Sequence, residues 1–301
     1  MNTTPLLDLP ELLPSWTLAL RAERKAAATI KSYSEGVNGY LRWCDRTGTV
    51  PDLTKPSVQA FVADLLDAGA QPKTAGARLI ALRRFSAWMA EEDIIDRDPL
   101  IGLKQPKVDR KVVEALTDEQ LLDLLKACNG KGFTDRRDEA IVRLLTETGM
   151  RANELIGLQV SDVDLKREFA TVRRGKGGKG RIVPFGPKTG QAIDRYLRAR
   201  KAHRLAHTDT LWLGADNWRT FSYFGMRHAL AARAKSAGIN DFHPHKMRHT
   251  AATRWLRAGG SEGGLMAVAG WSNRAMIDRY TGASAAERAA AEARGLNLGD
   301  L

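Results

Sequence analysis

The 301-residue chain has few cysteines and no long apolar run, and both absences exclude classes of protein. Its 2 cysteines, Cys44 and Cys128, form neither a CxxC pair nor a zinc spacing, so we expect no disulfide framework and no structural zinc. No apolar stretch approaches the length that crosses a membrane. Residues 1–16 also lack the basic start and apolar run of a signal peptide. These features suit a protein of the reducing cytosol.

The chain also has fewer acidic than basic residues. Lys and Arg number 47 against 35 Asp and Glu, which gives a net charge of +12. Excess positive charge favours polyanionic partners, because each phosphate contact releases counterions. Nucleic acid is therefore the favoured partner, although the same charge also fits a basic protein whose surface is only solvated.

The hydrophobic pattern divides the chain into two blocks. Apolar residues recur at helical spacing over residues 29–44, and two further helices are expected to open at Thr54 and Thr74. The sequence therefore predicts a small helical domain over residues 8–103.

A basic linker is expected over residues 104–114, where periodicity is lost and Pro106 stiffens the chain. A new helix follows, because Thr117 and Gln120 have the spacing of a capping box. The second domain is therefore expected to span residues 115–301.

The second block mixes helices with a short β-hairpin. Residues 169–173 and 181–185 have strand patterns, and the glycine-rich sequence RGKGGKG connects them. Helical patterns dominate again from Thr189. The predicted fold class is therefore mainly α with a small α+β component: a helical domain, a linker and a larger mixed domain.

Three segments of the second block carry residue types that bind phosphate. Arg151 follows a helix-ending glycine. Basic residues crowd the hairpin turn between Arg173 and Arg181. His245 and Arg248 are three positions apart, so on a helix they share a face. Each segment by itself also fits a simpler interpretation, such as a surface ion pair or a solvated turn.

The hairpin turn lacks the full pattern of a nucleotide-binding P-loop. Gly175 and Gly180 have the spacing GxxxxG, but Arg181 and Ile182 follow where Lys and Ser or Thr are required. The segment also lies between two strands rather than between a strand and a helix. We therefore expect no nucleotide and no other cofactor.

A metal site is the weaker interpretation of the histidine segment HPHKMRHT. His245 and His249 are four apart, a spacing that can hold zinc on a helix. However, Lys246 stands where the HExxH motif has glutamate, and no carboxylate cluster completes a site. A phosphate-facing pair of His245 and Arg248 is favoured instead.

The fourth segment, GWSNRAMIDRY, ends at Tyr280. By itself this is an ordinary helical tyrosine. Together with the segments upstream, however, the order Arg, Lys, His-x-x-Arg, Trp, Tyr resembles the tyrosine recombinase family, also called the phage integrase family. TGMRANEL, GKGGKGRIVP and HPHKMRHT carry the resemblance, which is strongest from Thr148 to Gly282.

The resemblance implies a site-specific recombinase that cuts and rejoins DNA through a 3′-phosphotyrosine, without metal or ATP. Arg151 and Arg248 would grip the scissile phosphate. Lys176 would protonate the leaving 5′-oxygen, with Lys179 as the less favoured alternative. Tyr280 would be the nucleophile, on a late helix.

Trp271 departs from the commonest pattern of the family, in which this position is histidine, although some members have tryptophan. An indole N–H donates a hydrogen bond but cannot accept a proton. His245 therefore becomes the expected proton acceptor for Tyr280. Glu154 matches an acidic position that supports Arg151.

The resemblance also implies an assembly. Two domains would form a C-shaped clamp on double-stranded DNA at core-type attachment sites, in a homotetramer on two DNA sites. DNA-bending accessory proteins are further candidate partners. The Ala-rich tail from about residue 283 is expected to dock on a neighbouring protomer, with a frayed terminus as the alternative. Few residues precede the helical domain, which indicates a minimal two-domain enzyme, Xer-like or of the phage integrase type.

Two other functions remain compatible with these residues. A type IB topoisomerase uses a similar Arg, Lys, His and Tyr set but relaxes DNA instead of exchanging strands. A non-catalytic DNA-binding regulator could keep the same fold, although all the reactive side-chain types are present here.

Overall fold

The computed structural model describes residues 8–108, 114–173, 180–216 and 218–277, together with residues 290, 293 and 294. The chain divides into two compact units, residues 1–111 and 112–301, and each has a hydrophobic core of its own. Among the described residues, no helix is both long and apolar enough to span a membrane.

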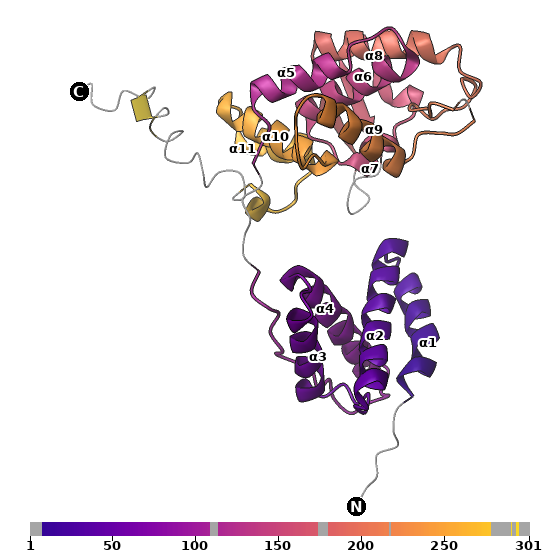
Figure 1. Ribbon diagram of the computed structural model, residues 1–301, viewed down its shortest axis with the longest axis vertical. Helices are drawn as coiled ribbons and strands as arrows, with labels where there is room; N and C mark the ends of the chain where they lie inside the picture. The colour runs from indigo at the N-terminus through magenta and orange to yellow at the C-terminus, as the bar shows by residue number, and fades with distance from the viewer. Residues whose placement is uncertain are drawn as a thin grey trace, which may run out of the picture. The chain divides into compact units, whose positions relative to one another are not determined.

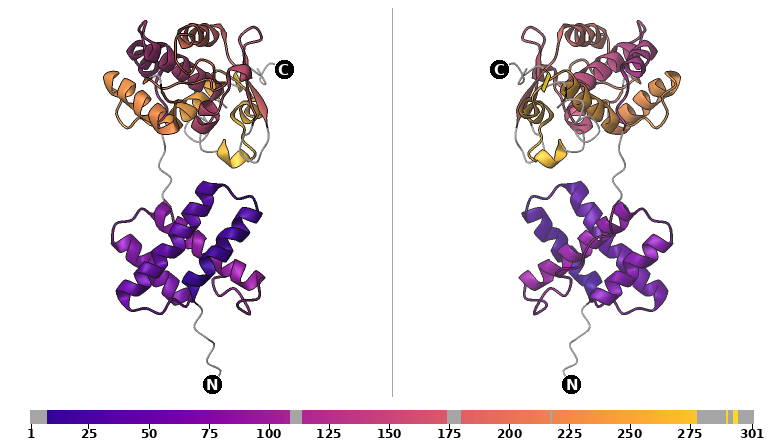
Figure 2. Two further views of the ribbon diagram at one scale, coloured as in Figure 1. Left: turned by 90° about the vertical axis from the view of Figure 1, so that its right-hand side faces the viewer. Right: turned by 90° about the vertical axis from the view of Figure 1, so that its left-hand side faces the viewer.

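The described part of the first unit is helical (Figure 1), and Figure 2 shows its helices crossing one another. Its helices are α1 (Leu9–Ala22), α2 (Ala27–Thr47), α3 (Lys55–Asp67) and α4 (Pro72–Glu91). Aromatic rings fill the core between them: Trp16 packs on Phe85 with ring centroids 4.9 Å apart, and Tyr40 meets Phe61 edge-on at 5.5 Å.

The first residues of two helices in this unit can be compared with the predictions from the sequence. The Thr54 side chain accepts a hydrogen bond from the Ser57 N–H and caps α3, as predicted. The next helix begins at Pro72 rather than at Thr74, because proline is well tolerated in the first turn of a helix. The helix α1, with Pro14 in its interior, was not among the predicted elements.

The second unit combines helices with one small antiparallel sheet, which confirms the predicted fold class. Its helices are α5 (Asp118–Ala127), α6 (Phe133–Thr148), α7 (Ala152–Ile156), α8 (Pro187–Arg200), α9 (Tyr223–Ser236), α10 (Pro244–Arg257) and α11 (Glu262–Ala269), with 3-10 turns η1 (Val160–Asp162) and η2 (Arg274–Met276). The capping box of Thr117 and Gln120 opens α5 as predicted.

The hairpin is part of a three-stranded sheet. The strands β2 (Phe169–Val172) and β3 (Arg181–Pro184) pair antiparallel, with Val172 opposite Arg181. The short strand β1 (Val163–Asp164) adds to the outer edge of β2 and was not predicted, because two residues are too short to show a period.

The helix α6 organises the core of this unit. It packs against α8 on one side and against α10 on another, and its buried side chains include Ile141, Leu144 and Leu145. A smaller apolar cluster joins α10 to α11 and contains Leu256, Leu265 and Trp271. This packing brings the end of α6 and the start of α10 together.

Candidate nucleic-acid interface and active site

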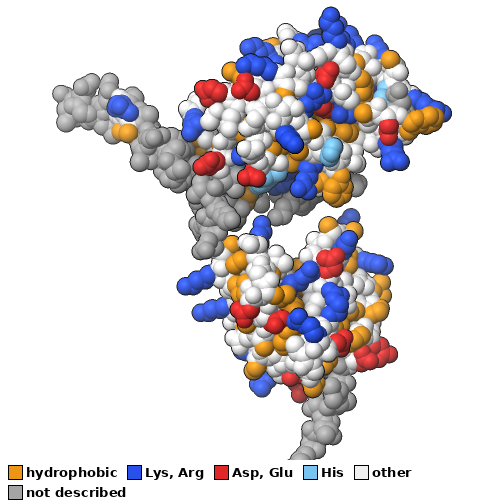
Figure 3. Space-filling model, in the orientation of Figure 1, with side chains coloured by type: hydrophobic (Ala, Val, Ile, Leu, Met, Phe, Trp, Pro, Cys, Tyr) orange, Lys and Arg blue, Asp and Glu red, His pale blue; other side chains and the backbone are white. Residues whose placement is uncertain are grey.

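A pocket of about 560 Å³ opens in the second unit where α7, α9 and α10 begin. It combines arginine, histidine and carboxylate side chains with a tyrosine. The lining residues are Met150, Arg151, Ala152, Asn153, Glu154, Tyr223, Pro244, His245, Arg248 and Met276. Figure 3 shows Lys and Arg side chains spread over the visible face of each unit.

Arg151 is placed by the turn between α6 and α7. Gly149 ends α6 in the left-handed conformation, φ 58°, which favours glycine. Arg151 is then the N-cap of α7, and its Nη1 donates to Oε1 of Glu154 at 2.8 Å while its Nη2 donates to the Gly270 carbonyl at 3.2 Å. Its side chain is still 30% exposed and lines the pocket, so part of it can meet a ligand.

Arg248 and His245 come from the first two turns of α10, as the spacing predicted. Arg248 is buried, and its Nη1 donates to the Gly149 carbonyl at 2.7 Å, which ties α10 to the end of α6. Both side chains line the same pocket as Arg151. The structure therefore brings three of the predicted site residues together from segments far apart in the sequence.

The histidine segment also carries its own helix cap. Nδ1 of His243 accepts a hydrogen bond from the Lys246 N–H at 3.2 Å. Burial, followed by the charges of Lys246 and Arg227, lowers the pKa of His243, which favours the neutral ring that such an acceptor needs. Within the described ranges, no group of three or more His, Cys, Asp or Glu side chains could hold a metal ion.

Trp271 lies beside Arg248 and outside the lining of the pocket. Gly270 ends α11 in the left-handed conformation, and Trp271 follows it into the apolar cluster between α10 and α11. The guanidinium carbon of Arg248 lies 5.1 Å from the centroid of the Trp271 ring. Trp271 therefore supports the placement of Arg248 through its ring face.

Glu154 holds a second arginine that the sequence reading did not single out. Nη1 and Nη2 of Arg181 donate to its two carboxylate oxygens at 3.1 and 2.6 Å. Burial alone would raise the pKa of Glu154, but the hydrogen bonds from Arg181 and Arg151 hold that pKa below its ordinary value. One sequence signal could have singled out Arg181. Side chains alternate between the two faces of a strand, so Arg181 lies on the same face of β3 as the buried Val183.

Three predicted residues lie outside the described part of the chain. Lys176 and Lys179 belong to residues 174–179, and Tyr280 belongs to residues 278–289. Their roles stay predictions, as does the docking of the tail from residue 283.

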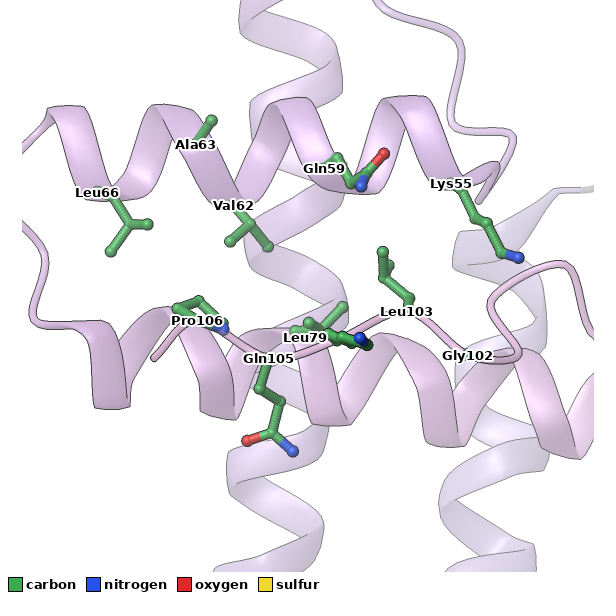
Figure 4. Close-up of a pocket in the computed structure, with 11 residues that line it drawn as sticks. Lys55, Gln59, Val62, Ala63, Leu66, Leu79, Gly102, Leu103, Gln105 and Pro106 are labelled. Carbon is green, nitrogen blue, oxygen red and sulfur yellow. The ribbon is translucent and has the colours of Figure 1, made fainter. Parts of the chain in front are cut away.

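The first unit has a pocket of different character, about 520 Å³ in volume. Figure 4 shows it between α3 and the segment that runs along α4, with Val62 and Leu66 on one side and Leu103 and Pro106 on the other. Its charged lining residues are lysines alone, so it offers no acid–base pair. The reactive side-chain types thus gather in the pocket of the second unit.

Family models match both units. The model described as the phage integrase family matches residues 114–287, and that of the phage integrase N-terminal SAM-like domain matches residues 13–93.

Two curated relatives are similar over most of the chain. The tyrosine recombinase XerC of Corynebacterium efficiens is 30% identical over 262 residues, which cover 85% of this chain and 81% of the relative. The tyrosine recombinase XerC of Staphylococcus carnosus is 31% identical over 271 residues, which cover 89% of this chain and 90% of the relative.

Solved structures share the fold. The crystal structure of XerA recombinase matches with a TM-score of 0.52 and 28% identity, over 90% of this chain and 93% of that one. A Tn1549 transposon integrase in complex with transposon right end DNA matches with a TM-score of 0.71 and 20% identity, over 95% and 99%. A lambda integrase tetramer bound to a Holliday junction matches with 0.69 and 15%, over 91% and 80%. At these last two identities, the likeness concerns the fold alone.

Proposed function

The chain belongs to the phage integrase family and is a site-specific tyrosine recombinase, and from this premise we propose that Tyr280 cuts DNA by forming a 3′-phosphotyrosine. The observation that carries the proposal is the convergence of Arg151, His245 and Arg248 on one pocket. The relatives named above are recombinases and integrases, and none is a topoisomerase or a regulator.

The two arginines fit the charge of the scissile phosphate. A guanidinium presents paired N–H donors whose spacing matches two phosphate oxygens. Arg248 is held by the Gly149 carbonyl and Arg151 by Glu154, so their positions are set before substrate arrives. Such preorganised donors stabilise the extra charge of the transition state without reorganising during the reaction.

The nucleophile needs help from its surroundings. A tyrosine hydroxyl has a pKa near 10, so it attacks phosphorus poorly until a base accepts its proton and positive charge stabilises the phenolate. His245, at the same pocket, is the proposed base. Trp271 cannot take that role, because an indole has no acceptor nitrogen.

The leaving 5′-oxygen needs a proton, and we assign this role to Lys176. Neighbouring cations lower the pKa of a lysine, which makes it a better acid near neutral pH. The phosphotyrosine conserves the energy of the broken bond, so attack by a new 5′-hydroxyl can reverse the step. The scheme uses protein cations alone and consumes no ATP.

The proposed partner is double-stranded DNA with core-type sites, held by a homotetramer in the cytosol. The support is the net charge of +12 and the fold shared with a lambda integrase tetramer bound to a Holliday junction. DNA-bending accessory proteins and docking of the C-terminal tail in trans belong to the same proposal.

Covalent trapping tests the function directly. The protein is incubated with a randomised pool of nicked duplexes, in which the fragment 5′ to the nick diffuses away after cleavage and prevents religation. We expect a protein–DNA adduct that survives denaturant, and peptide mapping should place the DNA on Tyr280. Attachment at another residue, or relaxation of supercoiled DNA with no sequence preference, would contradict the proposal.

A further inference from the structure

Arg181, the first residue of β3, turns into the protein although it follows the basic hairpin turn. Its side chain is only 12% exposed. Alternation along the strand explains this, because Arg181 and Val183 face one side while Ile182 and Pro184 face solvent. A charged side chain placed this deep needs specific partners.

The guanidinium of Arg181 has partners on two other elements. Nη1 and Nη2 bind the two carboxylate oxygens of Glu154 in α7, and Nε donates to the Val268 carbonyl near the end of α11 at 2.8 Å. One side chain therefore connects β3 with α7, whose residues line the pocket, and with the end of α11.

Close packing at Gly270 supports the same connection. A Cβ atom at Gly270 would lie 2.9 Å from the guanidinium carbon of Arg181, closer than side chains tolerate. The residue also has φ 65°, a left-handed conformation that favours glycine. On the other side of this turn, Nη2 of Arg151 donates to the Gly270 carbonyl. Two arginines thus hold the turn that leads into Trp271.

Charge balance gives Arg181 a consequence for the reaction. Glu154 is buried, at 5% exposure, and accepts hydrogen bonds from both Arg151 and Arg181. With two arginines on one carboxylate, a net positive charge is left for the phosphate. Without Arg181, Arg151 would be the sole guanidinium on that carboxylate, and the two charges would neutralise each other.

We propose that Arg181 is a positioning residue of the recombination site. By sharing the carboxylate of Glu154 with Arg151, it balances the carboxylate charge and leaves a net positive charge for phosphate, and by binding Val268 it holds the Gly270–Trp271 turn in place. This inference rests on the proposed function, since it presumes that Arg151 binds the scissile phosphate.

The test combines substitutions at both ends of the ion pair, on a nicked duplex selected from the randomised pool by covalent capture with the wild type. Arg181→Met should slow adduct formation about 100-fold, the scale for losing a preorganised donor, with DNA affinity changed far less. Arg181→Lys, which keeps the charge but loses the fork, should fall between Arg181→Met and the wild type.

The decisive readout is rescue by Glu154→Gln. Glutamine keeps an oxygen acceptor for Arg151 but removes the negative charge that would neutralise it, so the double variant Arg181→Met with Glu154→Gln should form adduct about tenfold faster than Arg181→Met alone, a coupling usual for residues of one network. If Arg181 has only a structural role, we expect the losses of rate caused by Arg181→Met and by Glu154→Gln to multiply in the double variant.

Arg233→Met is the matched control for stability. Arg233 also binds carboxylates, those of Asp135 and Asp138, and the Ala127 carbonyl, and its side chain is 23% exposed. The Arg233→Met substitution should lower the melting temperature with little loss of cleavage rate. Three outcomes would overturn the inference. The first is an equal loss of activity in Arg181→Met and Arg233→Met, and the second is that the losses from Arg181→Met and Glu154→Gln multiply in the double variant. The third is a wild-type rate in both Arg181→Met and Arg181→Lys. If Arg181→Met does not fold, Arg181→Lys decides. A wild type that forms no adduct overturns the proposed function as well.

Discussion

The guanidinium of Arg248 lies over the indole of Trp271, with its central carbon 5.1 Å from the ring centroid, and both side chains are buried. The same guanidinium donates to the carbonyl of Gly149. A cation over an aromatic face is stabilised by the ring quadrupole, more strongly where water is excluded. The tryptophan ring therefore supports Arg248, the proposed phosphate-binding arginine, and hydrogen-bond donation by the indole N–H stays a prediction.

Substitutions at Trp271 should separate these two roles. Trp271→Phe keeps a ring face for Arg248 and most of the packing, so we expect a folded protein that binds DNA but forms adduct more slowly. Trp271→Ala leaves a cavity and should cost about 3–5 kcal/mol in the free energy of unfolding. Denaturant titration and single-turnover cleavage measure the two effects. Wild-type cleavage by Trp271→Phe would remove any role for the N–H.

Loss of either pocket arginine should disable cleavage. Arg151→Ala and Arg248→Ala are each expected to slow adduct formation by about 100-fold or more, because a preorganised donor to the transition state is lost. Quench-flow measurement on the nicked duplex gives the rates. Arg195→Ala is the control, since Arg195 is a half-exposed arginine of α8 that pairs with Glu139 at 2.9 Å. Near-native cleavage by Arg151→Ala or Arg248→Ala would show that this arginine does not bind the scissile phosphate.

Tyr280→Phe should bind DNA with the affinity of the wild type and form no covalent adduct. The substitution removes one oxygen atom and with it the proposed nucleophile. Gel shift and denaturing electrophoresis on the same duplex separate binding from chemistry. Strand exchange that persists in this variant would falsify the assignment.

Chelation should leave cleavage unchanged. The proposed mechanism stabilises charge with arginines and lysine, so EDTA has no ion to remove. Adduct formation is measured after dialysis against EDTA and again after addition of Mg²⁺ or Zn²⁺. Strong inhibition, reversed by one of these metals, would revive the helical pair of His245 and His249 as ligands.

Acid should weaken the second unit partly through Glu154. Its pKa is held below the ordinary carboxyl value in the folded protein, so the unfolded chain binds its proton first as the pH falls. The stabilisation is therefore complete above the ordinary carboxyl pKa and is lost as the pH drops through the folded-state value. Melting temperatures of the wild type and Glu154→Gln should differ most near neutral pH and converge in acid. A constant difference would contradict this linkage.

Local sequence patterns determined the individual elements of this protein. The apolar period over residues 29–44, the caps at Thr54 and Thr117 and the strand patterns around the hairpin each report on neighbours a few positions away, and helices and strands depend on such neighbours. The resemblance to the family likewise came from an order of residues along the chain: Arg151, Lys176, His245, Arg248, Trp271 and Tyr280.

Tertiary structure alone decided which of these residues meet. Arg151 and Arg248 are joined through the turn at Gly149 because α6 packs on α10, and packing between helices far apart in sequence leaves no local period. In the sequence, Arg181 is one of the basic residues at the hairpin turn. Its position beneath Gly270, with both oxygens of Glu154 bound, follows from the way the sheet edge meets α7 and α11, a relationship between three segments that no single segment encodes.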